Sequence, residues 1–136
     1  MSTLFGEEHV QRYRETDGAE GHIWREGSTV LLLTTTGRSS GEPRTTPLIY
    51  QLDGENPVIV ASKGGAPDDP GWYRNLQKTP EAEVQILGDR VRVRARDAEG
   101  EERERLWAKM NEIWPHYGEY QEKTDREIPV VVLERA

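Results

Sequence analysis

The stretch from residue 34 to residue 47 carries the side chains best suited to binding an anion. It reads Thr-Thr-Thr-Gly-Arg-Ser-Ser-Gly-Glu-Pro-Arg-Thr-Thr-Pro, with seven hydroxyl side chains, two glycines and two arginines, Arg38 and Arg44. Guanidinium groups, hydroxyls and backbone N–H groups bind phosphate and carboxylate through charge-assisted hydrogen bonds. The simpler interpretation is a solvated turn with incidental arginines. This stretch alone leaves both interpretations open.

The net charge of the chain narrows the class of ligand. The 136 residues include 25 acidic and 18 basic side chains, which gives a net charge of -7. An acidic chain of this kind lacks the extended basic surface that nucleic-acid binding requires. A local basic turn on an acidic protein instead favours a small anionic ligand.

Two further features extend the candidate site. Residues 61–65 read Ala-Ser-Lys-Gly-Gly after an apolar run, and such glycines allow a flat ligand to approach the backbone closely. Aromatic residues stand beside expected loops at Trp72, Trp114, Tyr117 and Tyr120. Together with an anion site they favour a phosphorylated planar ring such as a flavin or deazaflavin. The alternative is that these aromatic residues belong to the core.

Other catalytic chemistries have little support. His9, His22 and His116 lack the spacing of metal ligands, so no metal is expected. The chain has no Gly-x-Ser-x-Gly, Rossmann or Walker motif. It also has no cysteine, which excludes disulfides, thiolate metal sites and cysteine nucleophiles and fits a reducing compartment.

The hydrophobic pattern predicts one α+β domain. Strands are expected at 28–36, 44–53, 57–62, 83–87, 90–96 and 128–133, and helices at 4–16, 72–78 and 100–113. The first three strands predict an antiparallel meander, Pro47 predicts an edge position or a bulge, and Gly88-Asp89 predicts a type II′ turn. Because open edges are a liability, we expect six or seven mostly antiparallel strands to curl into a barrel, with short helices inserted between them.

The first 27 residues are expected to form a helix and lead-in, and residues 28–136 the barrel core. Phe5, Val10 and Tyr13 give the helix a thin apolar stripe. Docking on the body is favoured over a membrane surface, because the polar face carries acids as well as bases. No signal-peptide pattern and no apolar run of about 20 residues is visible, so we expect a cytosolic protein. A weak membrane-surface association through this helix is left open.

Four motifs in register resemble the deazaflavin-dependent nitroreductase family of the FMN-binding split-barrel superfamily. They are Thr-Thr-x-Gly-Arg-x-Ser-Gly-x-Pro-Arg-x-x-Pro-Leu at 34–48, Ala-Ser-Lys-Gly-Gly at 61–65, Pro-x-Trp-Tyr-x-Asn-Leu at 70–76 and Pro-x-Tyr-x-x-Tyr-x-x-x-Thr-Asp-Arg-x-Ile-Pro-Val at 115–130. The resemblance implies a split β-barrel that binds reduced coenzyme F-420 and passes a hydride to a quinone, activated enone or nitro compound. An FMN-binding reductase and a non-catalytic F-420 carrier remain alternatives, and the protein is expected to be a monomer or a homodimer.

The resemblance also assigns residues to the coenzyme and the acceptor. The coenzyme-binding set is Arg38, Ser39, Ser40 and Arg44 for the phosphate and tail, Thr45, Thr46, Pro47, Leu48 and Ile49 on one side of the ring, Val60, Ala61, Ser62, Lys63 and Gly64 on the other, and Trp72, Tyr73 and Asn75 at its closure. Ser62 would lie near the reactive edge, and Tyr117, with Tyr120 one helical turn on, would donate a proton to the acceptor.

Two positions depart from the family pattern. Ser39 stands where the family commonly has a lysine, and Trp114 stands where a tyrosine is frequent. The first change removes one positive charge from the expected phosphate site, so coenzyme binding depends more on Arg38 and Arg44.

Overall fold

The apolar run before the candidate anion turn forms β1 (Val30–Thr36), which pairs antiparallel with β2 (Pro43–Ile49). The computed structural model describes residues 4–136. Its other strands are β3 (Gln51–Asp53), β4 (Asn56–Val60), β5 (Glu81–Ile86), β6 (Asp89–Asp97) and β7 (Val130–Arg135). The helices are α1 (Gly6–Thr16), α2 (Gly71–Lys78), α3 (Gly100–Ile113) and α4 (His116–Glu122), with short 3-10 turns η1 (Arg25–Gly27) and η2 (Lys63–Gly65).

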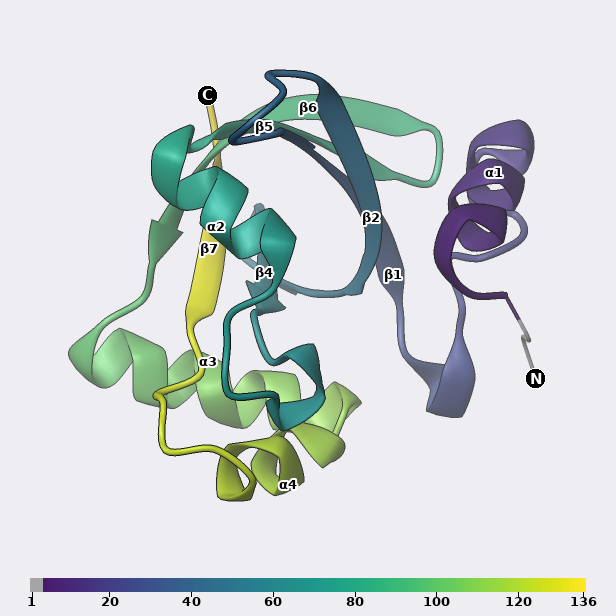
Figure 1. The fold of residues 1–136 in the computed structure, drawn as a ribbon. Helices are drawn as coiled ribbons and strands as arrows, with labels where there is room; N and C mark the ends of the chain where they lie inside the picture. The colour runs from purple at the N-terminus through teal and green to yellow at the C-terminus, as the bar shows by residue number, and fades with distance from the viewer. Residues whose placement is uncertain (1–3) are drawn as a thin grey trace.

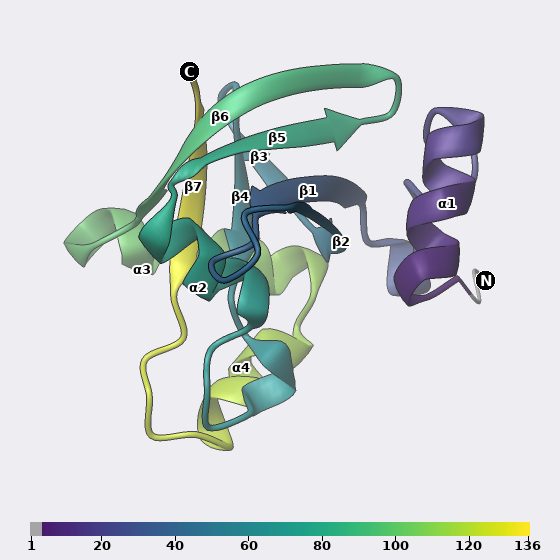
Figure 2. The same ribbon diagram turned by 45° about the horizontal axis from the view of Figure 1, so that its top comes forward.

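The strands form one curled sheet in the order β2-β1-β5-β6-β7-β4-β3 (Figures 1 and 2). The two edge strands, β2 and β3, are consecutive in the chain and are separated only by Tyr50. Because one residue joins opposite ends of the strand order, the sheet must bend round on itself. The predicted α+β class and the curled antiparallel sheet are confirmed. The edge position predicted from Pro47 is also confirmed, since among the strands that the structure describes β2 pairs with β1 alone.

Several local predictions need correction. The strand expected at 44–53 breaks at Tyr50, so its first half pairs with β1 and its second half with β4 instead of forming one flat meander. The β5–β6 turn lies one residue earlier than predicted, because Ile86 pairs with Asp89 and Leu87 adopts the left-handed φ of 55°. Residues 116–122, expected only as an aromatic segment, form α4.

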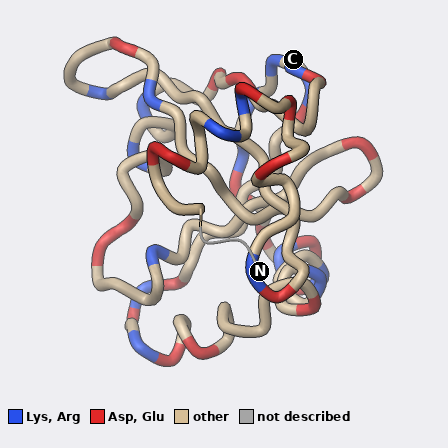
Figure 3. Tube along the Cα trace, turned by 90° about the vertical axis from the view of Figure 1, so that its right-hand side faces the viewer, with Lys and Arg blue, Asp and Glu red and all other residues tan. Residues whose placement is uncertain are grey.

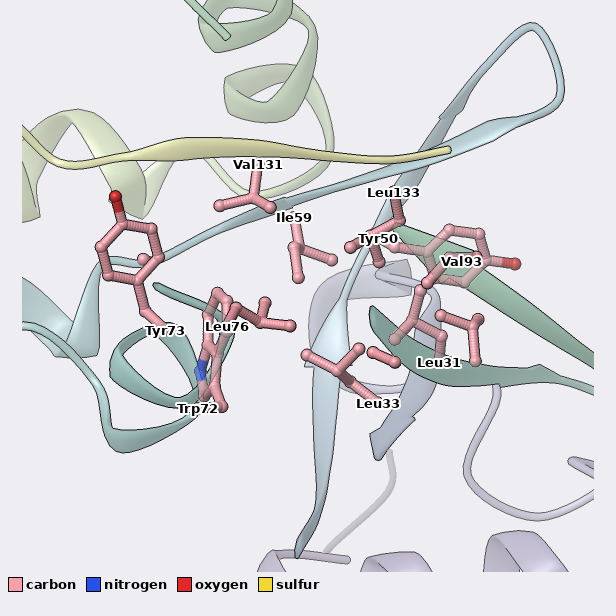
Figure 4. Close-up of a cluster of buried hydrophobic side chains, with 13 residues drawn as sticks. Leu31, Leu33, Tyr50, Ile59, Trp72, Tyr73, Leu76, Val93, Val131 and Leu133 are labelled. Atoms are coloured by element: carbon pink, nitrogen blue, oxygen red, sulfur yellow. The ribbon is translucent and has the colours of Figure 1, made fainter. Parts of the chain in front are cut away.

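Buried side chains cover both faces of the sheet. On one face, Leu31 and Leu33 of β1 pack with Trp72 and Leu76 of α2 (Figure 4). On the other face of β1, Val30 and Leu32 pack against α1. The full inner cluster is Leu31, Leu33, Tyr50, Ile59, Ala61, Trp72, Tyr73, Leu76, Ala82, Val84, Val93, Val131 and Leu133. Burial on both faces explains why the β1 sequence is almost continuously apolar.

The first helix docks on the sheet, as favoured from the sequence, through Tyr13 and Val10 of the predicted stripe, but Phe5 does not take part. Tyr13 is fully buried, and its hydroxyl accepts a hydrogen bond from the Leu87 backbone N–H at 2.8 Å. His9 is buried beside it, whereas Phe5 is 72% exposed. The helix therefore packs through two polar-tipped rings: Tyr13 satisfies a backbone group of the β5–β6 turn, and His9 is hydrogen-bonded to the Gly21 carbonyl.

Within residues 4–136, the Asp, Glu, Lys and Arg residues are exposed or half-buried. Figure 3 shows acidic and basic positions interspersed along the chain. The alternate arginines of β6 are exposed, as predicted, and two of them are paired: Arg94 with Glu81, and Arg96 with Glu102. Within residues 4–136, none of the helices combines the length and the apolar character needed to cross a membrane.

Candidate functional site

The loop between β1 and β2 forms one wall of a cavity of about 380 Å³. Its lining is rich in N–H and O–H donors. The lining residues are Gly37, Arg38, Ser39, Ser40, Arg44, Thr46, Gly71, Trp72 and Asn75. We call it the anion cavity, because two guanidinium groups and several hydroxyls converge on it and suit a phosphate or carboxylate.

Arg38 is held in place by α2. Asn75 is 5% exposed, and its Oδ1 accepts hydrogen bonds from the Arg38 backbone N–H at 3.1 Å and from Arg38 Nη1 at 2.9 Å. Asn75 Nδ2 donates to Thr35 Oγ1 at 3.0 Å, and Lys78 Nζ donates to the Arg38 carbonyl at 2.7 Å. Asn75 therefore orients the Arg38 guanidinium in the free protein.

Arg44, the second guanidinium of the anion cavity, is free. It is exposed, and its side chain has no hydrogen bond or ion pair within residues 4–136. Arg44 lies at the start of β2, just after a turn that is tight at Gly37, where an added Cβ would lie 2.7 Å from Ser40 Oγ. All the donors of Arg44 are therefore available to an anion.

A second cavity, of about 410 Å³, shares Thr46 and Trp72 with the first. Most of its lining is apolar or aromatic, and it contains no carboxylate. It is lined by Phe5, Gly6, His9, Trp24, Val30, Thr46, Pro47, Leu48, Ile49, Val60, Ser62, Lys63, Gly64, Pro70, Trp72, Trp114, Tyr117 and Tyr120. We call it the aromatic cavity, and its walls suit a flat ring.

One wall of the aromatic cavity is an unusual turn at η2. Lys63, Gly64 and Gly65 all have positive φ, at 46°, 63° and 85°. A Cβ on Gly65 would lie 2.6 Å from the Tyr120 carbonyl, so glycine allows the turn to lie directly against α4. Ser62, just before the turn, is 8% exposed.

Helix α4, which packs against this turn, presents phenol groups to the same cavity. Burial raises the pKa of the Tyr117 hydroxyl, with the neighbouring Tyr120 as a smaller cause. Its hydroxyl has no hydrogen-bond partner in the described part of the chain. Tyr120, whose ring lies 6.2 Å from that of Tyr117, accepts a hydrogen bond from Trp114 Nε1 at 3.3 Å. The Tyr117 phenol therefore stays protonated at neutral pH and can donate a proton into the cavity.

The structure brings most of the predicted site residues together. Arg38, Ser39, Ser40, Arg44 and Asn75 line the anion cavity, and Pro47, Leu48, Ile49, Val60, Ser62, Lys63, Gly64, Tyr117 and Tyr120 line the aromatic cavity, with Thr46 and Trp72 at their junction.

Three of the predicted site residues lie outside these linings. Thr45 faces α1 and accepts a hydrogen bond from Arg14, Ala61 is fully buried, and Tyr73 turns into the core, where its hydroxyl donates to Asp97 at 2.6 Å (Figure 4).

The N-terminal segment supplies a wall that the sequence did not predict. Trp24 stacks on Trp114 with ring centroids 5.8 Å apart, and the His9 ring centroid lies 6.0 Å from that of Trp24. His9 Nε2 is hydrogen-bonded to the Gly21 carbonyl at 2.8 Å, which fixes the ring. Phe5 completes this side of the cavity. No local pattern marks these residues, because only long-range folding brings them to the site.

A family model described as F420H(2)-dependent quinone reductase matches residues 5–135. An F420H(2)-dependent quinone reductase of Mycobacterium tuberculosis (strain ATCC 25618 / H37Rv) is 44% identical over 130 residues, which are 93% of this chain and 87% of the relative.

Two solved structures are similar over most of their length. One, described as an F420-H2 dependent reductase (FDR-A), has a TM-score of 0.72 and 44% identity, and the match covers 77% of this chain and 93% of that chain. The other, described as a domain-swapped dimer, has a TM-score of 0.75 and 41% identity and covers 93% and 95%.

Proposed function

The chain belongs to the F420H(2)-dependent quinone reductase family, and from this premise we propose that it binds reduced F-420 across both cavities and reduces a quinone. The predicted oxidoreductase class and the predicted F-420 dependence are confirmed by this membership. The narrower name nitroreductase is not confirmed, because the family description names quinones.

The observation that carries the proposal is the continuity of the two cavities. Thr46 and Trp72 line both, so one ligand can place an anionic group beside Arg38 and Arg44 and a planar ring among apolar walls. The donor set of the anion cavity fits the coenzyme phosphate, since guanidinium groups bind phosphate oxygens bidentately. Neither cavity alone accounts for a ligand of this shape.

Reduced F-420 supplies a hydride from C5 of its deazaflavin ring when it is bound. The β2 residues 46–49 and the turn at 62–64 would hold the ring, and Trp72 and Trp114, which also line the cavity, would shield it from water. Reduction of a quinone to a hydroquinone also consumes a proton. Tyr117, which lines the same cavity, would donate that proton to the quinone oxygen, and Tyr120 would share the role.

The finer features of this function are part of the same proposal. The aromatic cavity contains no carboxylate to exclude other electron-poor rings, so we include activated enones and nitro compounds as acceptors. We propose a homodimer because the chain is similar to a structure described as a domain-swapped dimer. We propose a cytosolic location because the chain has no cysteine, which fits a reducing compartment. Membrane contact through α1 is not proposed, since its Arg12 is paired with Glu20 at 3.1 Å.

Coenzyme titration and turnover together test the proposal. Purified protein is titrated with F-420 and, separately, with FMN, and oxidation of reduced F-420 is then followed with menadione as acceptor. We expect saturable binding of F-420 and menadione-dependent oxidation. Saturable binding of FMN without binding of F-420 would overturn the coenzyme assignment. Binding of F-420 without oxidation by any of a panel of quinones, enones and nitro compounds would identify a carrier.

A further inference from the structure

Arg126, in the segment between α4 and β7, lies behind the wall of the aromatic cavity. Its side chain is 16% exposed and is not part of the lining. Nε donates to the Ala66 carbonyl at 2.9 Å, Nη2 to the Ser62 carbonyl at 2.8 Å, and Nη1 to the Ala61 carbonyl at 3.2 Å. Nη1 also contacts Asp69 Oδ1 at 2.9 Å, which balances the charge. One guanidinium thus clamps the whole 61–69 loop.

The clamped loop has a backbone conformation that needs support from outside. Its residues Lys63, Gly64 and Gly65 have consecutive positive φ values, and Lys63 is not a glycine. A non-glycine residue with positive φ is disfavoured unless the surrounding structure holds it. The guanidinium supplies that support, because its planar fork fixes the direction of several carbonyl groups at once.

The carbonyl directions determine where the N–H groups point. The described chain has no cis peptide bond, and a trans peptide directs its N–H opposite to its C=O. The Ala61 and Ser62 carbonyls point toward Arg126, so the N–H groups of Ser62 and Lys63 point away from it. Neither N–H has a partner within residues 4–136, and both residues line the aromatic cavity.

We infer that Arg126 is a positioning residue that turns the Ser62 and Lys63 N–H groups into the aromatic cavity, where they bind a carbonyl oxygen of a bound ring. Two fixed donors at one oxygen stabilise negative charge on it without reorganisation. The inference rests on the proposed function, which places rings in this cavity. The oxygen belongs to the coenzyme ring or to the quinone, and the experiment separates these sources.

The matched variants are Arg126→Gln, Arg126→Lys and Arg103→Gln. Arg103 is a suitable control, because it is 19% exposed, donates to the Ile128 carbonyl at 2.6 Å and pairs with Glu127 at 3.0 Å, without contacting the 61–69 loop. Each variant is assayed for thermal stability, for the Kd of F-420 by fluorescence, and for kcat and KM with menadione. NMR-detected exchange of the Ser62 and Lys63 amides is measured with and without F-420 in the wild type.

We expect Arg126→Gln to lower kcat/KM by about 100-fold, the cost of a displacement of about 1 Å at a reacting group. Arg126→Lys should recover part of this loss, and Arg103→Gln should lower stability alone. If F-420 supplies the oxygen, its Kd rises in Arg126→Gln and the two amides become protected when it binds. If the quinone supplies it, the Kd is unchanged and protection requires menadione as well as oxidised F-420.

The outcomes distinguish a failure of the proposed function from a failure of the positioning role of Arg126. If the wild type neither binds F-420 nor oxidises it with quinones, the proposed function itself fails. If the wild type is active but Arg126→Gln and Arg126→Lys behave like Arg103→Gln, or if the two amides gain no protection from either ligand, the positioning role of Arg126 is overturned. Arg126→Lys keeps the test decisive if Arg126→Gln does not fold.

Discussion

Replacement of Arg44 by alanine should weaken coenzyme binding without changing stability. The Arg44 side chain is exposed and has no partner in residues 4–136, so its removal breaks no contact of the free protein. In the complex it would make hydrogen bonds to a phosphate, and such bonds to charged groups contribute about 1.5–3 kcal/mol. That corresponds to a Kd raised by about 10- to 150-fold. Arg44→Lys keeps the charge but not the planar guanidinium fork, so its Kd should lie between those of the wild type and Arg44→Ala.

The assay is fluorescence titration of F-420 at two salt concentrations, with Arg92→Ala as the matched control. Arg92 is also exposed and without a side-chain partner in the described residues, but it lies on β6, away from the anion cavity. Both substitutions lower the net charge by one, so any difference between them is local. Equal Kd values for Arg44→Ala, Arg92→Ala and the wild type would refute the phosphate role of Arg44.

Three further predictions address other parts of the site. Tyr117→Phe should leave the F-420 Kd unchanged and slow quinone turnover by about 100-fold, and equal rates would reduce Tyr117 to a wall residue. Gly65→Ala should destabilise the protein by about 2 kcal/mol in denaturant unfolding, because the new Cβ would lie 2.6 Å from the Tyr120 carbonyl; wild-type stability would contradict this close approach. Hydrogen bonds to Glu26 and Glu119 raise the pKa of His116, so its stabilising contribution is complete below pH about 6.5 and is lost as pH rises through the raised pKa. His116→Gln should flatten the thermal-stability profile in that window, and an unchanged profile would show that the contact contributes nothing.

The fold could be predicted from the sequence wherever local pattern determines the element. The continuous apolar run of β1 predicts a strand that is buried on both faces, and the alternation in β6 predicts a strand that is buried on one face. The burial patterns of the two strands agree with this. The break at Tyr50 could not be predicted, because residues 44–53 have strand character throughout. The break exists because the two halves pair with β1 and β4, at opposite ends of the sheet. Long-range pairing decides such a bend.

In the candidate site, too, some parts are predictable from local sequence and others depend on tertiary contacts. The anion turn and the glycine turn at 62–65 carry their own local signals, in arginine, hydroxyl and glycine content. The contribution of Trp24 and His9 carries none, because it depends on a contact between the N-terminal segment and Trp114 at the end of α3. Likewise, the partners of Arg126 lie some sixty residues away in sequence. Such side chains become functional candidates only when the tertiary contacts are known.

The Pro-x-Trp-Tyr-x-Asn-Leu motif owes its spacing to α2. Trp72 and Asn75, three residues apart, lie on one face of the helix. Trp72 lines both cavities, and Asn75 fixes Arg38 in the anion cavity. Tyr73 and Leu76 pack into the core, and the Tyr73 hydroxyl bonds to Asp97 at 2.6 Å. The helix therefore sets the separation between the phosphate end and the ring end of the site, and Tyr73 serves it by anchoring the helix, since it lies outside both linings.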